Sequence, residues 1–257
     1  MGAIKGLLLD VDGVLYQAGS ALPGAASALA RLREAGFPFR LVTNTTRNSK
    51  AGLLGRLSRM GLDVAPSELV TTGEVARAAI ARDGARPFLL VHENLRVDCP
   101  PEADEPDSVL IGDAGPGFTY ERLNRAFRIL IEGGRLYALA RNRYFRGADG
   151  LDLDAGPFVA ALEYASGAKA QLLGKPDPAF FLAAAAGMGP DPAETLMVGD
   201  DVDADVLGAI AAGFESTLVR TGKFREGDET RAMKGGGRVL PSIAEVVDEV
   251  LGRSPMR

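Results

Sequence analysis

Residues 6–13 have the sequence GLLLDVDG, and this stretch decides the fold class. The apolar run Gly6–Leu9 has the length of one buried strand, and Asp10 closes it. Asp12 follows two positions later, so both carboxylates can point to the same side where the strand ends. Gly13 then allows the chain to turn sharply. The stretch therefore predicts a buried strand with two carboxylates at its carboxyl end.

Short apolar runs alternate with helical patterns along the rest of the chain. The further predicted strands are residues 39–42, 69–71, 88–91, 109–111, 136–139, 171–173, 196–198, 217–219 and one near Val239. The predicted helices are one between Pro23 and Gly36, one along residues 53–60, and others near 120–132, 157–166, 203–212 and 242–251. Strands that alternate with helices form a parallel sheet covered on both faces, so the predicted fold class is α/β with a Rossmann-like parallel sheet.

The composition is that of an ordinary soluble globular protein, with 46% hydrophobic and 25% charged residues. The net charge of −5 argues against binding to nucleic acid or to an anionic membrane. No apolar run is long enough to span a bilayer. The single cysteine, Cys99, cannot form an internal disulfide and fits a reducing compartment. We therefore expect a cytoplasmic protein with neither a nucleic-acid nor a membrane partner.

The first of four polar clusters is formed by Asp10 and Asp12. Two carboxylates at a strand end can divide the work of phosphoryl chemistry: one attacks phosphorus, and the other transfers a proton to the leaving group. The alternative is an acidic turn or part of a calcium loop. An EF-hand loop requires Glu at its twelfth position, which is Ala21 here.

The second cluster, Thr43-Asn44-Thr45, follows a predicted strand and precedes a helix that starts near residues 47–49. Hydroxyl groups and free backbone N–H groups at a helix start suit a phosphate. Simple helix capping by Asn or Thr explains the same residues, and taken alone the motif fits capping better.

The third cluster is Lys175 in the sequence GKPDP, at residues 174–178. An ammonium group there could neutralise phosphate charge and hold a carboxylate nucleophile; the alternative is a solvated lysine in a turn. It is not a P-loop lysine, because Lys169 stands where that motif requires its first glycine.

The fourth cluster has four carboxylates within the stretch 199–205, GDDVDAD, after an apolar strand. Carboxylates so close together are costly without a cation, and hard oxygen ligands favour Mg²⁺. An acidic helix N-terminus is the alternative, and it explains Asp203 and Asp205 better than Asp200. Because ligands bind at the carboxyl ends of parallel strands, we expect all four clusters to meet in one crevice.

In their order and spacing the four motifs resemble the haloacid dehalogenase superfamily of phosphatases. The matching residues are DVDGV at Asp10, the pair Thr43-Asn44, the lysine of GKPDP and the acidic run at Asp200. The long stretch between the second and third motifs resembles subclass IIA, in which a cap domain is inserted there. The resemblance implies a catalytic core of residues 1–75 plus 176–257 and a smaller inserted α/β cap of residues 76–175.

The resemblance also implies a role for each motif. Asp10 would form an aspartyl phosphate, and Asp12 would protonate the leaving group and then activate water. Mg²⁺ would be held by the Asp10 carboxylate, the Asp12 backbone carbonyl and the Asp200 carboxylate. The implied phosphate-binding residues are Thr43, Asn44, Thr45 and Lys175, with Asp201 or Asp205 orienting Lys175 or metal-bound water.

The cap offers one further candidate, Arg143, in a basic loop that follows a predicted cap strand. Arg143 could contact the substrate, or the loop could be a solvated basic surface. Gly112-Asp113 repeats the Gly-Asp pair of the fourth motif without its other carboxylates, which indicates a turn in the cap. The only histidine, His92, excludes a histidine-rich metal site.

Several stretches resemble a branch of this subclass that acts on phospholysine, phosphohistidine and pyrophosphate, in which a serine stands in place of Asp12. Asp12 restores full acid-base capacity, which favours monoesters of small phosphorylated metabolites as substrates. A phosphoryl transferase or mutase on the same scaffold is an alternative. A non-catalytic phosphate-binding module is another, although no nucleophile, lysine or metal ligand is lost here. Caps of this subclass often mediate a homodimer, but the sequence does not fix the oligomeric state.

Overall fold

The computed structural model describes residues 3–146 and 149–252. The chain forms two compact units. The first unit consists of Met1–Thr43, Leu54–Val70 and Lys175–Arg257, and the second consists of Asn44–Leu53 and Thr71–Gly174. The second unit differs from the predicted cap of residues 76–175 in that it also includes residues 44–53 and 71–75 and excludes Lys175.

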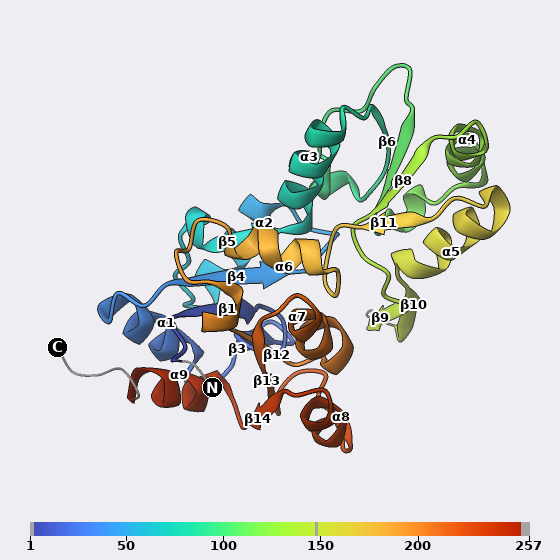
Figure 1. The fold of residues 1–257 in the computed structure, drawn as a ribbon. Coiled ribbons are helices and arrows are strands. Elements are labelled where there is room, and N and C mark those ends of the chain that lie inside the picture. Colours follow the sequence, from blue (N-terminus) through green and yellow to red (C-terminus); the bar gives the residue numbers. More distant parts are fainter. Residues whose placement is uncertain (1–2, 147–148, 253–257) are drawn as a thin grey trace. The chain divides into compact units, whose positions relative to one another are not determined.

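The first unit contains a six-stranded sheet in the order β14-β13-β12-β1-β4-β5 (Figure 1). Its strands are β1 (Gly6–Asp10), β4 (Phe39–Thr43), β5 (Leu69–Thr71), β12 (Thr195–Gly199), β13 (Glu215–Val219) and β14 (Arg238–Leu240). The pairs from β14 to β4 are parallel. Leu7, Leu8 and Leu9 of β1 are fully buried, as expected for a strand covered on both faces.

Helices and short turns complete the first unit. The helices are α1 (Ala25–Glu34), α6 (Pro178–Ala185), α7 (Gly208–Ala211), α8 (Asp228–Lys234) and α9 (Ile243–Gly252), and α2 (Lys50–Arg59) continues from the second unit into the first. The smaller elements are η1 (Pro66–Glu68), η4 (Pro192–Glu194), the π-helical turn η5 (Val202–Leu207) and the hairpin of β2 (Tyr16–Gln17) with β3 (Ser20–Ala21).

The second unit has its own four-stranded parallel sheet in the order β11-β8-β7-β6. Its elements are α3 (Thr72–Asp83), β6 (Pro87–Leu90), η2 (Glu93–Leu95), β7 (Ser108–Ile111), η3 (Gly115–Gly117), α4 (Tyr120–Ile131), β8 (Arg135–Ala138), the antiparallel pair β9 (Tyr144–Arg146) and β10 (Leu151–Leu153), α5 (Ala155–Ser166) and β11 (Ala170–Leu172). Leu89 packs with α3, whereas Phe88 and Leu90 pack with α4 and α5. Helices therefore cover both faces of this sheet.

The predicted α/β class with a parallel central sheet is confirmed. Residues 203–212, predicted as one helix, form η5 followed by the short α7. Helix α3 was not predicted, because small side chains such as Ala76 and Ala79 form most of its buried face and give a weak apolar pattern. None of the described helices has the length and apolar character that crossing a membrane requires.

Candidate active site

The first unit brings polar residues together at the carboxyl ends of four neighbouring strands. Asp10 ends β1 and Thr43 ends β4, while Asp200 follows β12 and the loop 221–223 follows β13. The register pairs Leu9 with Val198 and Asp10 with Val42, so these ends lie at one edge of the sheet. This edge is where open parallel sheets bind ligands.

Lys175 is the buried cation of this cluster. Its Nζ lies 2.6 Å from Asp10 Oδ1 and 2.7 Å from Asp205 Oδ1, and the residue is only 4% exposed. Burial alone would lower the pKa of Lys175, but Asp10 and Asp205 together outweigh burial and raise the pKa above its usual value. Lys175 therefore stays charged and fixes the position of the Asp10 carboxylate.

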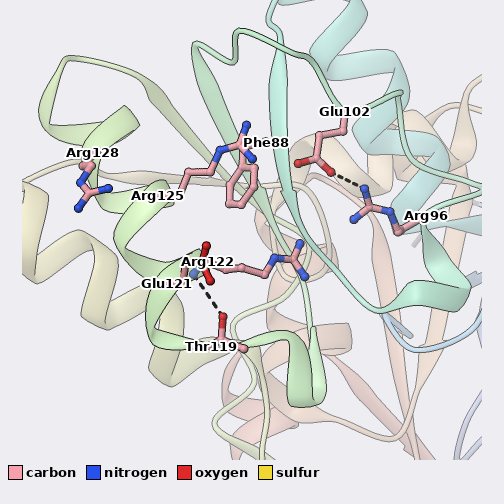
Figure 2. A pocket seen from close by; sticks show the side chains of 8 residues that line it. All are labelled: Phe88, Arg96, Glu102, Thr119, Glu121, Arg122, Arg125 and Arg128. Carbon is pink, nitrogen blue, oxygen red and sulfur yellow. Dashed lines mark hydrogen bonds and ion pairs between the residues drawn. The ribbon is translucent and has the colours of Figure 1, made fainter.

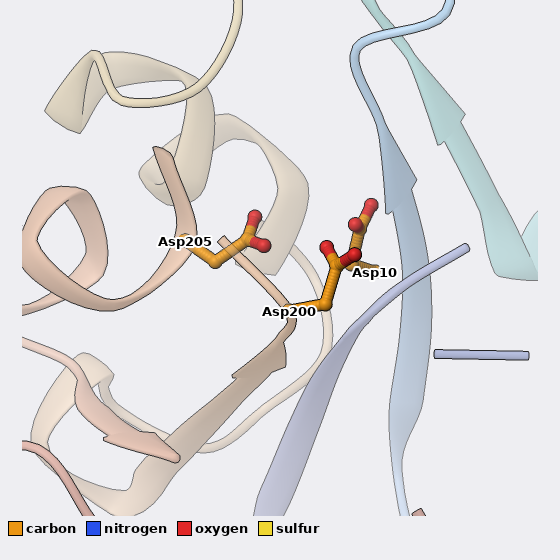
Figure 3. Close-up of side chains that lie close together, drawn as sticks. All are labelled: Asp10, Asp200 and Asp205. Carbon is orange, nitrogen blue, oxygen red and sulfur yellow. The ribbon is translucent and has the colours of Figure 1, made fainter. Parts of the chain in front are cut away.

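Three carboxylates face one another in this cluster (Figure 3). Oxygens of Asp10, Asp200 and Asp205 all lie within 4.8 Å of one another, and all three residues are buried. Asp200 Oδ2 accepts a hydrogen bond from the backbone N–H of Lys223 at 2.6 Å. Asp200 Oδ1 is buried and has no hydrogen-bond partner among the described residues. A buried carboxylate oxygen without a partner is costly, so its surroundings fit a bound cation.

The protonation of Asp200 supports the same interpretation. Burial, followed by the nearby Asp10 and Asp205 carboxylates, raises the pKa of Asp200 well above its usual range. A divalent cation would replace this repulsion by attraction, and carboxylate oxygens are the ligands that Mg²⁺ prefers. The residues present therefore fit a divalent cation.

Asp201 and Asp205, the two candidates for orienting Lys175, have different partners. Asp205 forms the ion pair with Lys175, and its Oδ2 accepts the backbone N–H of Asp201 at 3.1 Å. The side chain of Asp201 caps η5, because its Oδ1 accepts the backbone N–H groups of Asp203 at 3.1 Å and Ala204 at 3.0 Å. Asp205 is thus the member of the pair that contacts Lys175.

Asp12 lies in the turn after β1, where the backbone N–H of Gly13 donates to the carbonyl of Tyr16 at 2.7 Å. Part of Asp12 reaches solvent, yet the surrounding protein removes much of the water from its carboxylate. This desolvation, followed by the charge of Asp10, raises the pKa of Asp12 above its usual value. A carboxyl group of this kind can carry a proton more readily than an ordinary surface aspartate.

Two glycines allow backbone to approach Asp200. Gly13 has φ 87° and Gly222 has φ 63°, and a Cβ atom on either would lie 2.0 Å from Asp200 Oδ2. Gly222 was not predicted from the sequence, nor was Thr221, whose hydroxyl donates to the carbonyl of Gly13. Lys223, whose backbone N–H donates to Asp200, was not predicted either. The available signal was a Thr-Gly-Lys sequence that begins two positions after the predicted strand 217–219.

The remaining predicted phosphate-binding residues belong to the second unit. Asn44 Oδ1 lies against Gly174, because a Cβ at Gly174 would be 2.8 Å from it. The second motif therefore lies beside the residue that precedes Lys175. The carbonyl of Thr45 accepts a hydrogen bond from the Thr72 hydroxyl at 3.4 Å. The roles of Asn44 and Thr45 in phosphate binding stay predictions.

Arg143 is exposed, and its guanidinium lies 6.0 Å from the ring centroid of Tyr144. Its contact with substrate also stays a prediction. Asp113, predicted to lie in a cap turn, is buried; it accepts the backbone N–H of Gly115 at 2.9 Å and pairs with Arg47. His92 caps η2, since its Nδ1 accepts the backbone N–H of Asn94 at 3.2 Å.

The sequence matches two family models, one in its N-terminal part and one in its C-terminal part. Residues 7–99 match the haloacid dehalogenase-like hydrolase model, and residues 172–246 match a HAD-hydrolase-like model. The chain belongs to the haloacid dehalogenase-like hydrolase family.

Particular relatives extend the likeness over nearly the whole chain. Phospholysine phosphohistidine inorganic pyrophosphate phosphatase of Bos taurus is 39% identical over 258 residues, 98% of this chain and 96% of that protein. The 4-nitrophenylphosphatase of Thermotoga maritima has a TM-score of 0.87 and 31% identity, with 96% of this chain and 97% of that chain covered. A glycerol phosphate phosphatase of Mycobacterium tuberculosis in complex with magnesium has a TM-score of 0.83 and 26% identity, with 93% of this chain and 75% of that chain covered. The predicted family and its class of enzyme, a phosphatase, are confirmed.

Proposed function

We propose that this protein is a Mg²⁺-dependent phosphatase that hydrolyses a small phosphorylated metabolite through an aspartyl phosphate on Asp10. The observation that carries the proposal is the buried Asp10–Lys175–Asp205 arrangement beside the unpartnered oxygen of Asp200. This is a fixed carboxylate nucleophile, with a cation on one side and a candidate metal ligand on the other.

The charges explain how an anion could attack another anion. Asp10 and a phosphate group repel each other, and Lys175 offsets part of that repulsion in a buried setting where charges act strongly. When bound, Mg²⁺ would supply the remaining positive charge. Its ligands would be the carboxylates of Asp10 and Asp200 and the backbone carbonyl of Asp12. The solved magnesium complex of the M. tuberculosis relative supports the choice of metal.

The reaction would proceed in two displacements. An oxygen of Asp10 attacks phosphorus, the bond to the leaving oxygen breaks, and Asp12 donates its proton to that oxygen. Asp12 then accepts a proton from water, which attacks phosphorus and releases inorganic phosphate with regeneration of Asp10. The raised pKa of Asp12 supports its role as the proton carrier. Thr43, Asn44, Thr45 and Lys175 would bind the phosphoryl oxygens.

Asp12 also bears on the substrate class. An alkyl leaving group is a poor one and requires a proton, which a carboxyl group at position 12 can supply. We therefore propose phosphate monoesters of small metabolites rather than a restriction to phosphoramidates or pyrophosphate. Arg143, exposed at the start of the β9–β10 hairpin, is the proposed contact for the leaving group.

The test compares Asp10→Asn with Asp203→Asn, using p-nitrophenyl phosphate with Mg²⁺. Asp203 lies in the acidic stretch 199–205 of the fourth motif, but it is exposed and pairs with Arg231 at 2.6 Å. We expect Asp10→Asn to abolish turnover, and Asp203→Asn to retain it. Chelation with EDTA should stop the reaction of the unchanged protein, and added Mg²⁺ should restore it.

Two further measurements separate the alternatives. Acid quenching during turnover, followed by mass spectrometry, should find a phosphoryl group on the peptide that contains Asp10. Hydrolysis in water labelled with heavy oxygen should put the label into the released phosphate. A phosphoryl transferase would instead pass the group to an added alcohol, and metal-independent turnover or an active Asp10→Asn variant would refute the proposal.

A further inference from the structure

The second unit carries a basic pocket that the phosphatase chemistry does not use (Figure 2). It has a volume of about 730 Å³ and lies between β6, α4 and the loop that follows η2. We call it the arginine pocket; its lining residues include Phe88, Arg96, Thr119, Arg122, Arg125 and Arg128. Four arginines stand against two glutamates there, Glu102 and Glu121, although the whole chain has a net charge of −5.

Two of the arginines are held against the same aromatic ring. The guanidinium of Arg125 lies 4.6 Å from the ring centroid of Phe88, and that of Arg122 lies 5.7 Å from it. Arg122 also donates to the backbone carbonyl of Leu89 at 2.6 Å, which fixes its orientation. Such stacking restricts the two side chains before any ligand arrives, so less entropy is lost on binding.

Among the described residues, no carboxylate forms an ion pair with either of these two cations. Arg96 forms an ion pair with Glu102, but within residues 3–146 and 149–252 neither Arg122 nor Arg125 forms one. Like charges held around one ring repel each other, and an anion bound by both would convert this repulsion into attraction. The side chain of Phe88 is buried, so it supports the guanidinium groups rather than offering a free face to a ligand.

We propose that the arginine pocket binds a small polyanion that carries phosphoryl groups, at a site separate from the carboxylate cluster of the first unit. Guanidinium groups bind phosphate oxygens in a bidentate manner. Here the ring of Phe88 already holds the guanidinium groups of Arg122 and Arg125 in place. Thr119 caps α4 by accepting the backbone N–H of Arg122 at 3.3 Å, and its hydroxyl hydrogen remains able to donate to a bound oxygen. The volume is that of a small-ligand site.

The test is calorimetric titration of the full chain with tripolyphosphate in EDTA at constant ionic strength. Removing divalent cations keeps the carboxylate cluster anionic, so that site repels the probe. We expect binding of one tripolyphosphate per chain. Arg125→Gln should weaken it at least about tenfold, because one charge-assisted phosphate contact is lost.

Arg82→Gln is the matched control, because Arg82 is an exposed arginine of the same unit that pairs with its neighbour Asp83. It should bind tripolyphosphate like the unchanged protein. Arg122→Gln, checked for folding by its thermal unfolding curve, should weaken binding as Arg125→Gln does. Absence of binding to the unchanged protein, or equal affinity of the Arg125→Gln and Arg82→Gln variants, would overturn the proposal.

Discussion

Replacing Asp200 with asparagine should stabilise the metal-free protein and remove its response to Mg²⁺. Asp200 is 1% exposed, and its Oδ1 finds no partner in the described part of the chain. Asparagine keeps the shape, and its carbonyl oxygen can still accept the backbone N–H of Lys223. The amide N–H groups of the asparagine can donate to the carboxylates of Asp10 and Asp205, whereas the negative charge of Asp200 repels them.

The expected size follows from the charge separation. Two unit charges within 4.8 Å repel by at least about 3.5 kcal/mol at an effective dielectric constant of about 20. Protonation limits the penalty, because neutralising an ordinary aspartate at pH 7 costs only about 4 kcal/mol. Lys175 offsets a further part of the repulsion. We therefore expect a gain of about 1–3 kcal/mol, with the melting temperature rising about 2–4 °C for each kcal/mol.

The raised pKa of Asp200 should also make the stability of the metal-free protein depend on pH. Because the folded-state pKa of Asp200 is raised, the folded protein binds more protons than the unfolded chain between the two pKa values. Metal-free stability should therefore fall as the pH rises from about 5 to about 8, and the slope should be smaller in Asp200→Asn. Lys175 contributes no slope in this range. Because its pKa is raised in the folded protein, the stability that its charge provides is lost only in strongly alkaline solution.

The assay is thermal unfolding followed by circular dichroism, in EDTA and in Mg²⁺, across that pH range. Mg²⁺ should raise the melting temperature of the unchanged protein and of Asp203→Asn, but not that of Asp200→Asn. An Asp200→Asn variant that is less stable than the unchanged protein without metal, and whose stability falls with pH at the same slope, would refute this prediction.

Three further substitutions test other parts of the structure. Gly222→Ala should lower kcat/KM for p-nitrophenyl phosphate at least about 100-fold, because the added Cβ would displace the Asp200 carboxylate. Gly227→Ala, also at positive φ but with open space around it, should lose about 1 kcal/mol of stability and stay active. Arg47→Ala should lower the free energy of unfolding in urea by about 1–3 kcal/mol, because Asp113 stays buried without its guanidinium; an unchanged midpoint would contradict this. Asp12→Asn should lower kcat/KM for an alkyl phosphate by about 100-fold or more, but kcat/KM for p-nitrophenyl phosphate much less, since p-nitrophenolate leaves without a proton. The quantity kcat/KM excludes the later attack of water, in which Asp12 serves both substrates, so equal losses in kcat/KM would argue against Asp12 as the proton donor.

The sequence was sufficient to find Asp10, Lys175 and Asp200, because each follows or precedes a short apolar run that is itself a local signal. The rule that parallel strands expose ligands at their carboxyl ends then predicted their convergence, and the structure brings them into one cluster. Their chemical roles remain proposals. The same reasoning could not find Gly222 or Lys223, since their approach to Asp200 depends on how β13 pairs with β12.

The division of the chain was harder to predict than the fold. Residues 44–53 belong to the second unit because of contacts between distant positions, such as the ion pair of Arg47 with Asp113 and the hydrogen bond from the Lys50 backbone to Asp98. Neither residue of such a pair has a distinctive local pattern. The spacing of apolar residues therefore carries no information about them.

The acidic loop after β12 illustrates how backbone geometry separates residues that look equivalent in sequence. Asp201, Asp203 and Asp205 all fit an acidic helix start, but η5 opens with a wide turn in which Val206 donates to the carbonyl of Asp201. Asp201 caps this turn, while Asp205 approaches the end of β12 closely. It can do so because Gly199 has no side chain: a Cβ there would lie 2.2 Å from the Cβ of Asp205. The glycine of the motif thus leaves the room that Asp205 needs to pair with Lys175.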